Sequence, residues 1–159
     1  FLYPILLEVG WKEAPFTQMP AKGAYMWRDL ERQAILRGLP YNKPAVYPPN
    51  SLQSGRVGIL AAKEGWCADF TRHVFHGHFV EGRMIGEENT LREALAALGK
   101  EPDEVIAAAQ SPENKEALHS QTDQAKKLGI FGAPSFVVDN ELFWGDDRLE
   151  NALAWQGQD

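Results

Sequence analysis

The stretch Gly129-Ile-Phe-Gly-Ala-Pro-Ser-Phe136 decides the fold of this 159-residue chain, because it joins a helix to a strand through a proline. Gly129 is typical of a helix C-terminus, and Pro134 is tolerated at a strand entrance, where its missing N–H is not needed. If the Ala133–Pro134 bond is cis, the chain turns sharply there. The backbone N–H and C=O of Ala133 are then free to pair with a peptide-like ligand. The alternative is an ordinary turn proline, and spacing alone does not decide between the two.

The residues after this stretch predict a β-hairpin and a short final helix. Ser135 to Asp139 is rich in β-forming residues, a turn-like Asp-Asn pair follows, and Glu141 to Trp144 forms the second strand. The acidic Asp-Asp-Arg run then leads into a helix over Leu149 to Trp155, with Asp147 and Glu150 loosely matching a capping box. The C-terminal part is therefore strand, strand, helix.

The residues before this stretch predict one early strand and a helical block. Phe1 to Val9 is almost entirely apolar and is interpreted as a strand that Pro4 ends, followed by a loop over Gly10 to Pro20. Glycine stops and Ser, Asn or Pro starts predict helices over 21–37, 51–64, 66–80, 87–98, 101–110 and 111–128. The order predicts an α/β domain made of residues 1–20 and 129–159, interrupted by a helical insertion over residues 21–128.

Composition excludes several classes of function. Sixteen basic and 22 acidic residues give a net charge of -6, so no basic surface for nucleic acid or anionic lipid is expected. No apolar run approaches the roughly 20 residues that cross a bilayer. Cys67 is the only cysteine, which excludes an internal disulfide and CxxC chemistry. A cytoplasmic protein that acts on a small molecule is the default expectation.

Two paired motifs carry a resemblance to a known family. The stretch quoted above, followed by Leu142-Phe-Trp-Gly-Asp-Asp-Arg-Leu149, resembles the C-terminal part of the 2-hydroxychromene-2-carboxylate isomerase family. That family is close to kappa-class glutathione transferases, within the DsbA-like thioredoxin superfamily. Pro20 to Leu30 and Tyr47 to Leu52 also match it. The resemblance implies an α/β, thioredoxin-like fold with an inserted all-helical domain, and glutathione as cofactor.

The resemblance also assigns roles to four residues near the hairpin. It implies a cis bond at Pro134, with the backbone of Ala133 binding the cysteinyl part of glutathione. Asp146 and Asp147 would hold the γ-glutamyl end, Asp147 more than Asp146. A helix N-terminus favours the glutamyl carboxylate, and an aspartate favours the ammonium group. The alternative is that both aspartates only cap the helix.

Further residues are candidates for ligand contacts in the helical block and the early loop. Lys22 stands at a helix start, where the dipole prefers anions, and the resemblance implies that it binds a carboxylate of glutathione or of the substrate. The alternative is a solvated surface lysine. Trp11 and Tyr25, together with Trp27, could line an aromatic substrate pocket, or they could be core residues. Asn50 is most simply a helix cap, and a substrate contact is the second interpretation.

Two features that resemble reactive sites are interpreted as structural. The spacing of His73, His76 and His78 does not place all three on one face of a helix, so no metal site is expected. Cys67 has no neighbouring cysteine and is expected to be a buried structural thiol.

The catalytic residue stays unassigned. In the family that the chain resembles, a catalytic serine follows the first strand, and no segment here corresponds to it. The N-terminal β-α unit of a thioredoxin core therefore has no counterpart. The strand edges left open by that absence predict a homodimer or an incompletely packed fragment.

Three functions remain in competition at this point. The first is glutathione-dependent isomerisation of an aromatic carboxylate, in which the thiol of glutathione supplies the sulfur chemistry that the chain cannot. The second is conjugation of glutathione to electrophiles by a kappa-like transferase. The third is a DsbA-like module that binds thiol peptides without catalysis.

Overall fold

The computed structural model describes residues 1–11, 13 and 15–157, which form two compact units. Unit 1 consists of Phe1–Lys12 and His119–Asp159, and unit 2 is Glu13–Leu118. One long helix, α8 (Pro112–Lys127), passes from unit 2 into unit 1. None of the helices in the described residues is long and apolar enough to cross a membrane.

The N-terminal segment is a helix, so the predicted strand over Phe1 to Val9 is wrong. Helix α1 spans Leu2–Glu8, and Val9 N–H donates to Ile5 O at 3.2 Å at its end. An apolar run without alternation fits a buried helix as well as a strand. Pro4 lies in the first turn of the helix, where backbone N–H groups have no partner inside the helix, so its missing donor costs nothing.

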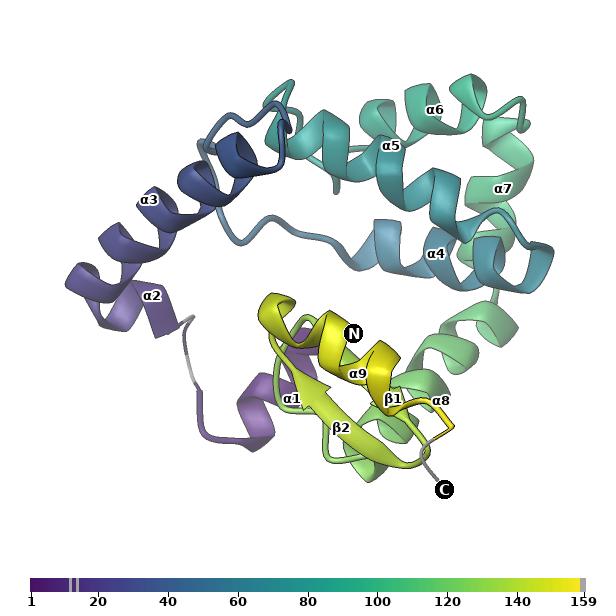
Figure 1. Cartoon of the computed structure of the whole chain (residues 1–159). Coiled ribbons are helices and arrows are strands. Elements are labelled where there is room, and N and C mark those ends of the chain that lie inside the picture. Colours follow the sequence, from purple (N-terminus) through teal and green to yellow (C-terminus); the bar gives the residue numbers. More distant parts are fainter. Residues whose placement is uncertain (12, 14, 158–159) are drawn as a thin grey trace. The chain divides into compact units, whose positions relative to one another are not determined.

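Unit 1 is built around a two-stranded antiparallel hairpin (Figure 1). Strands β1 (Ser135–Val138) and β2 (Glu141–Trp144) pair with Phe136 opposite Phe143. Both residues of the connecting turn, Asp139 and Asn140, have positive φ angles of 49° and 65°, as a two-residue hairpin turn requires. The hairpin and its turn confirm the prediction.

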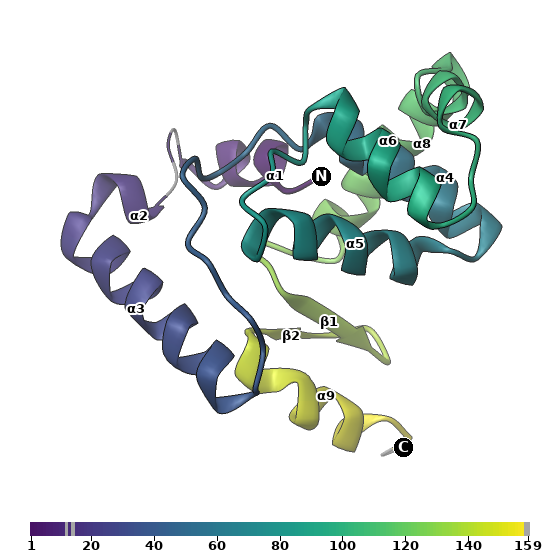
Figure 2. The same cartoon turned by 90° about the horizontal axis from the view of Figure 1, so that it is seen from above.

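Helices surround the hairpin in unit 1. The 3-10 helix η1 (Asp146–Arg148) leads into α9 (Leu149–Trp155), which packs against both strands (Figure 2). Helix α1 is tied to α8 by two polar contacts. The N-terminal ammonium of Phe1 donates to Thr122 Oγ1 at 2.8 Å, and Lys126 Nζ lies 2.5 Å from Glu8 Oε1.

Unit 2 consists entirely of helices and connecting segments in its described part. Its helices are α2 (Pro15–Gln18), α3 (Pro20–Leu36), α4 (Leu52–Glu64), α5 (Cys67–Phe79), α6 (Glu88–Ala97), α7 (Pro102–Ala109) and the start of α8. Helix α2 lies in the predicted loop over Gly10 to Pro20, which corrects that prediction. The other helices begin and end within about two residues of the predicted bounds.

The core of unit 2 is formed by helices α4, α5, α6 and α7. Large apolar side chains from these helices are almost fully buried, among them Val57, Phe70, Leu91, Leu95 and Ile106. Helix α3, by contrast, buries only Gly23. A Cβ at Gly23 would lie 2.5 Å from Phe16 O, so the glycine lets the backbone of α2 approach α3 closely.

Candidate functional site

The turn before β1 presents an exposed peptide backbone. The Ala133–Pro134 bond is cis, as the resemblance implies, and both residues are exposed. Within the described part of the chain, no hydrogen bond engages the N–H or C=O of Ala133. Pro134 O accepts a hydrogen bond from Gly145 N–H at 3.1 Å, which fixes the turn against the end of β2. The exposed Ala133 therefore carries a main-chain donor and a main-chain acceptor that have no partner among the described residues.

The two candidate aspartates follow directly at the end of β2. Gly145 has a φ angle of 120°, and a Cβ there would lie 2.5 Å from Asp147 Oδ1. The carboxylate of Asp147 thus folds back over the residue that binds Pro134 O. Asp147 Oδ2 also lies 3.5 Å from Nη2 of Arg148, and both side chains are exposed. An acidic group and a basic group stand side by side next to the exposed turn.

Neither aspartate occupies an N-cap position in the structure. The N-cap of η1 is Gly145 and that of α9 is Arg148, and neither helix has a side-chain cap hydrogen bond. The loose capping box between Asp147 and Glu150 is therefore wrong. Asp146 is exposed but engaged with other groups of the chain.

An aromatic pair beside the turn was missed by sequence reasoning. The rings of Phe131 and Trp144 have centroids 5.0 Å apart at an interplanar angle of 58°, and 44% and 54% of these residues is exposed. Both residues belong to the quoted motifs, but only their position across the hairpin brings them together. The sequence signal that could have indicated this pair is Trp144, an aromatic residue at the end of β2 that lies directly opposite Ser135.

The structure places the remaining candidates in different parts of the chain. Trp11 belongs to unit 1 and is half-buried, and its backbone N–H donates to Leu6 O at 2.9 Å. Lys22 and Tyr25 lie one turn apart near the start of α3 in unit 2, both exposed. No ion pair of Lys22 occurs among the described residues. Ala133, Pro134, Asp146 and Asp147 are therefore grouped together, whereas Lys22, Tyr25 and Asn50 belong to the other unit.

Asn50 is held against a neighbouring turn. Its Oδ1 accepts the N–H of Leu52, the first residue of α4, at 3.2 Å. The N-cap position itself is Ser51, so Asn50 satisfies a helix-start N–H from one residue before the cap. The main chain of Asn50 also packs on Gly86, where a Cβ would overlap Asn50 O. Ser54 donates a hydrogen bond to Ile85 O close by.

Tyr47 is the centre of an aromatic cluster in unit 2. Its ring centroid lies 5.3 Å from Phe16, 5.1 Å from Trp27, and 6.2 Å from both His78 and Phe79. Burial raises the pKa of the Tyr47 hydroxyl above its ordinary value. Trp27, a candidate pocket residue, is therefore a packing residue of this cluster, with Lys43 Nζ 5.0 Å above its ring.

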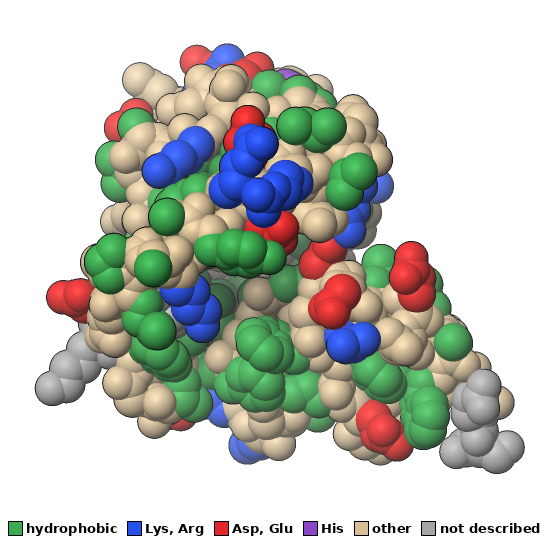
Figure 3. Space-filling model, turned by 60° about the vertical axis from the view of Figure 1, so that its left-hand side comes forward, with side chains coloured by type: hydrophobic (Ala, Val, Ile, Leu, Met, Phe, Trp, Pro, Cys, Tyr) green, Lys and Arg blue, Asp and Glu red, His purple; other side chains and the backbone are tan. Residues whose placement is uncertain are grey.

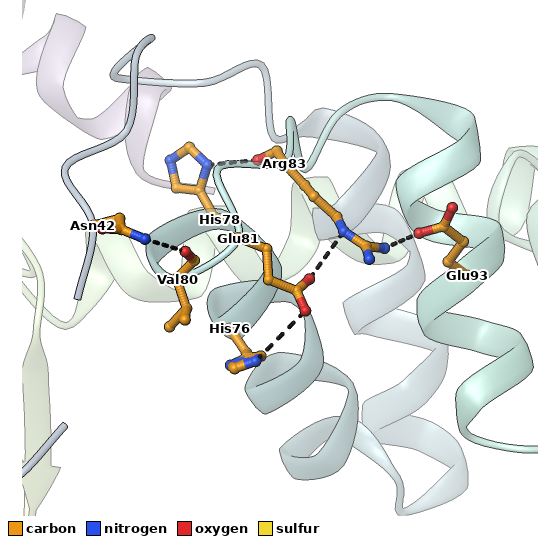
Figure 4. A network of polar contacts seen from close by, with 7 residues as sticks. All are labelled: Asn42, His76, His78, Val80, Glu81, Arg83 and Glu93. Carbon is orange, nitrogen blue, oxygen red and sulfur yellow. Dashed lines mark hydrogen bonds and ion pairs between the residues drawn. The ribbon is translucent and has the colours of Figure 1, made fainter. Parts of the chain in front are cut away.

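The histidines of α5 differ in environment. His78 is buried, and its Nδ1 lies 3.0 Å from Arg83 O, which can only accept, so Nδ1 carries the proton. His76 instead lies 3.7 Å from Glu81, which also binds Arg83, and Arg83 reaches Glu93 (Figure 4). No group of three potential metal ligands occurs in the part of the chain that is described. This network connects the turn after α5 to α6.

Cys67 is half-buried at the start of α5. Its Sγ lies 3.9 Å from Thr71 Oγ1, one turn further along the same helix. The contact is consistent with a packing role.

Comparison with known proteins places this chain in a family. Residues 2–154 match the DSBA-like thioredoxin domain. The chain belongs to this family. The DSBA-like fold is mostly helical here, with the small two-stranded sheet described above.

Relatives in the DSBA-like family include named enzymes. The chain is 28% identical over 125 residues to 2-hydroxychromene-2-carboxylate isomerase from Sphingobium xenophagum, which covers 79% of this chain and 63% of that protein. It is 29% identical over 146 residues to glutathione S-transferase kappa 2 from Caenorhabditis elegans, covering 83% of this chain and 65% of that protein. A solved 2-hydroxychromene-2-carboxylate isomerase superposes with a TM-score of 0.84 at 26% identity, over 97% of this chain and 76% of that chain. The chain spans slightly less than two thirds of these two curated relatives.

Proposed function

We propose that the chain binds glutathione at the Ala133–Pro134 turn and belongs to a glutathione-dependent isomerase of aromatic carboxylates. The proposal rests on one observation: the unengaged backbone groups of Ala133 and the carboxylate of Asp147 lie on either side of the Gly145–Pro134 hydrogen bond. The names of the relatives support the class of reaction, an isomerase or a glutathione transferase. The similarity to a solved isomerase supports the same assignment.

The residues present fit the groups of glutathione. An extended peptide can pair with the N–H and C=O of Ala133 as an added strand pairs with a sheet edge. The amino-acid end of the γ-glutamyl group carries an ammonium and a carboxylate together, and the adjacent Asp147 and Arg148 offer the complementary charges. When bound, glutathione supplies a thiol that can add to a conjugated substrate and leave again. The residues of this chain hold the peptide and orient that thiol.

Calorimetric titration with reduced glutathione tests the binding claim. Asp147→Asn removes the charge but keeps the shape, and we expect it to weaken binding about tenfold, as loss of a charge-assisted contact does. Asp139→Asn is the matched control, because Asp139 lies in the turn at the other end of the hairpin and asparagine tolerates its positive φ angle. The parent chain failing to bind, or equal affinities of the two variants, would falsify the proposal.

Conjugation of glutathione is the second candidate, and the kappa-class relative from Caenorhabditis elegans favours it. Two assays with the same protein separate the candidates. Glutathione-dependent conversion of a 2-hydroxychromene-2-carboxylate supports the isomerase, and conjugation to a chloronitrobenzene supports the transferase. Binding of glutathione without either reaction supports a module that only binds thiol peptides.

A further inference from the structure

The aromatic pair beside the Ala133 turn has more exposed surface than packing alone accounts for. Phe131 and Trp144 contact each other, yet about half of each residue faces solvent. Large rings usually bury most of their area, because each contributes strongly to the hydrophobic free energy of folding. Exposed hydrophobic side chains also occur elsewhere on the surface (Figure 3), but singly exposed residues are ordinary. Phe131 and Trp144 differ from such single residues, because their rings contact each other and lie next to the backbone groups of Ala133 that have no partner.

Gly132 is what brings the indole of Trp144 to this place. A Cβ at Gly132 would lie 2.6 Å from Trp144 Nε1 and 3.3 Å from its Cδ1, so the indole rests on bare backbone. Ser135 Oγ donates to Gly132 O at 2.7 Å and holds that backbone still. Gly132 directly precedes Ala133. The indole therefore contacts the residue that directly precedes the groups that would pair with a peptide.

We infer that Phe131 and Trp144 form an aromatic shelf that binds a flat aromatic group carried on the sulfur of the bound tripeptide. This inference rests on the proposed function. A peptide paired with Ala133 places its side chains beside the neighbouring backbone, where the shelf begins. Rings prefer offset or edge-to-face contact with other rings, and the tilted Phe131–Trp144 pair offers both surfaces. The charged Asp147–Arg148 end binds the opposite, amino-acid end of the ligand.

The test compares S-benzylglutathione with unsubstituted glutathione by calorimetric titration of the whole chain. Stacking of one ring contributes roughly a tenfold gain, so the parent chain should bind the benzyl conjugate about tenfold more tightly. Trp144→Leu should remove that advantage to within about twofold and keep the affinity for glutathione itself. Gly132→Ala should reduce the advantage as well, because the new methyl group displaces the indole.

Trp155→Leu is the matched control, since Trp155 of α9 is 43% exposed in the same unit but its ring contacts Phe143 of β2. Circular dichroism identifies variants that fail to fold, and Phe131→Leu gives an independent second probe of the shelf. The inference is overturned if the parent chain shows no preference for the benzyl conjugate. It is also overturned if Trp144→Leu and Phe131→Leu keep that preference. In either case, the proposed function still stands if the parent chain binds glutathione and Asp147→Asn weakens that binding. Binding of neither ligand overturns both proposals.

Discussion

At Gly86 the backbone of unit 2 is packed so closely that no side chain fits. A Cβ at this position would overlap Asn50 O and lie 3.0 Å from Asn50 C, so Gly86→Ala must push the Asn50 segment away. Overpacking against backbone costs about 1–3 kcal/mol, and we expect a loss of that size in the free energy of unfolding measured in urea. Because Asn50 is a predicted substrate residue, the same change should raise KM in any activity assay.

Gly58 provides the matched control for Gly86. It lies inside α4 with no atom within 4 Å of an added Cβ. Alanine is a better helix former than glycine, so Gly58→Ala should stabilise the chain by up to about 1 kcal/mol. If both substitutions change stability in the same direction, the close contact between Gly86 and Asn50 is wrong.

The raised pKa of the Tyr47 hydroxyl predicts a loss of stability in alkali. Burial raises its pKa above the ordinary value of 10.0, so the unfolded chain releases this proton at a lower pH than the folded chain. Above about pH 10 the folded state then binds more protons, and the free energy of unfolding falls as pH rises. Tyr47→Phe should make that fall shallower in denaturant titrations at increasing pH.

Tyr41 allows a check on the alkaline prediction. Its pKa is also raised, first by burial and then by the charge of Glu31. Combining Tyr41→Phe with Tyr47→Phe should therefore flatten the pH dependence more than Tyr47→Phe alone. An unchanged slope in Tyr47→Phe would contradict the assigned burial.

Whole helices could be predicted from sequence because their ends are decided locally. Ser111 Oγ accepts the N–H of Asn114 at 3.2 Å, as the Ser-Pro start of α8 predicts. Gly65 and Gly99 take positive φ angles of 83° and 67° just after the helices that they end. The turn between β1 and β2 follows the same rule. Such signals need no knowledge of the rest of the chain.

Elements and contacts that depend on distant residues could not be predicted in the same way. The apolar run over Leu2–Glu8 fits a strand or a helix by its pattern alone, and the contacts that α1 makes with α8 involve residues far along the chain. The Phe131–Trp144 shelf depends on the register of the hairpin. The free backbone groups of Ala133 were predicted only on the condition that the Ala133–Pro134 bond is cis, and the structure supplies that cis bond.

Asn114 joins three helices, and no sequence pattern indicates it. It is 3% exposed, and its Nδ2 donates to Arg56 O in α4 at 2.9 Å and to Ala109 O in α7 at 3.0 Å. Asn114→Ala removes both donors and leaves a small cavity, so we expect thermal and urea unfolding to show a loss of about 2–3 kcal/mol. Asn151→Ala, an exposed asparagine in α9, should change stability by less than about 0.5 kcal/mol. Equal effects of the two changes would refute the role of Asn114.

At the scale of the whole molecule, the candidate residues divide between two units. Unit 1 holds the peptide-binding turn, the acidic helix start and the aromatic shelf. Unit 2 holds Lys22, Tyr25 and Asn50. The proposed contacts of Ala133, Asp147 and the aromatic shelf with a ligand all lie in unit 1. Titrations of these contacts are therefore independent of any role that the helical unit has in choosing a substrate.

The open edge of the hairpin predicts self-association. Gly145 N–H binds Pro134 O, and bonded pairs alternate along an antiparallel ladder, so the backbone of Val137 faces away from β2. Within the described residues this edge of β1 has no partner strand, and such edges pair readily with a second copy.

We propose a homodimer, with light scattering giving twice the 17.8 kDa of one chain. Val137→Lys should return the monomer, because paired edges would then bring like charges together. Val46→Lys, at an exposed valine in unit 2, should leave the dimer intact. A stable monomer of the parent chain would refute the proposal.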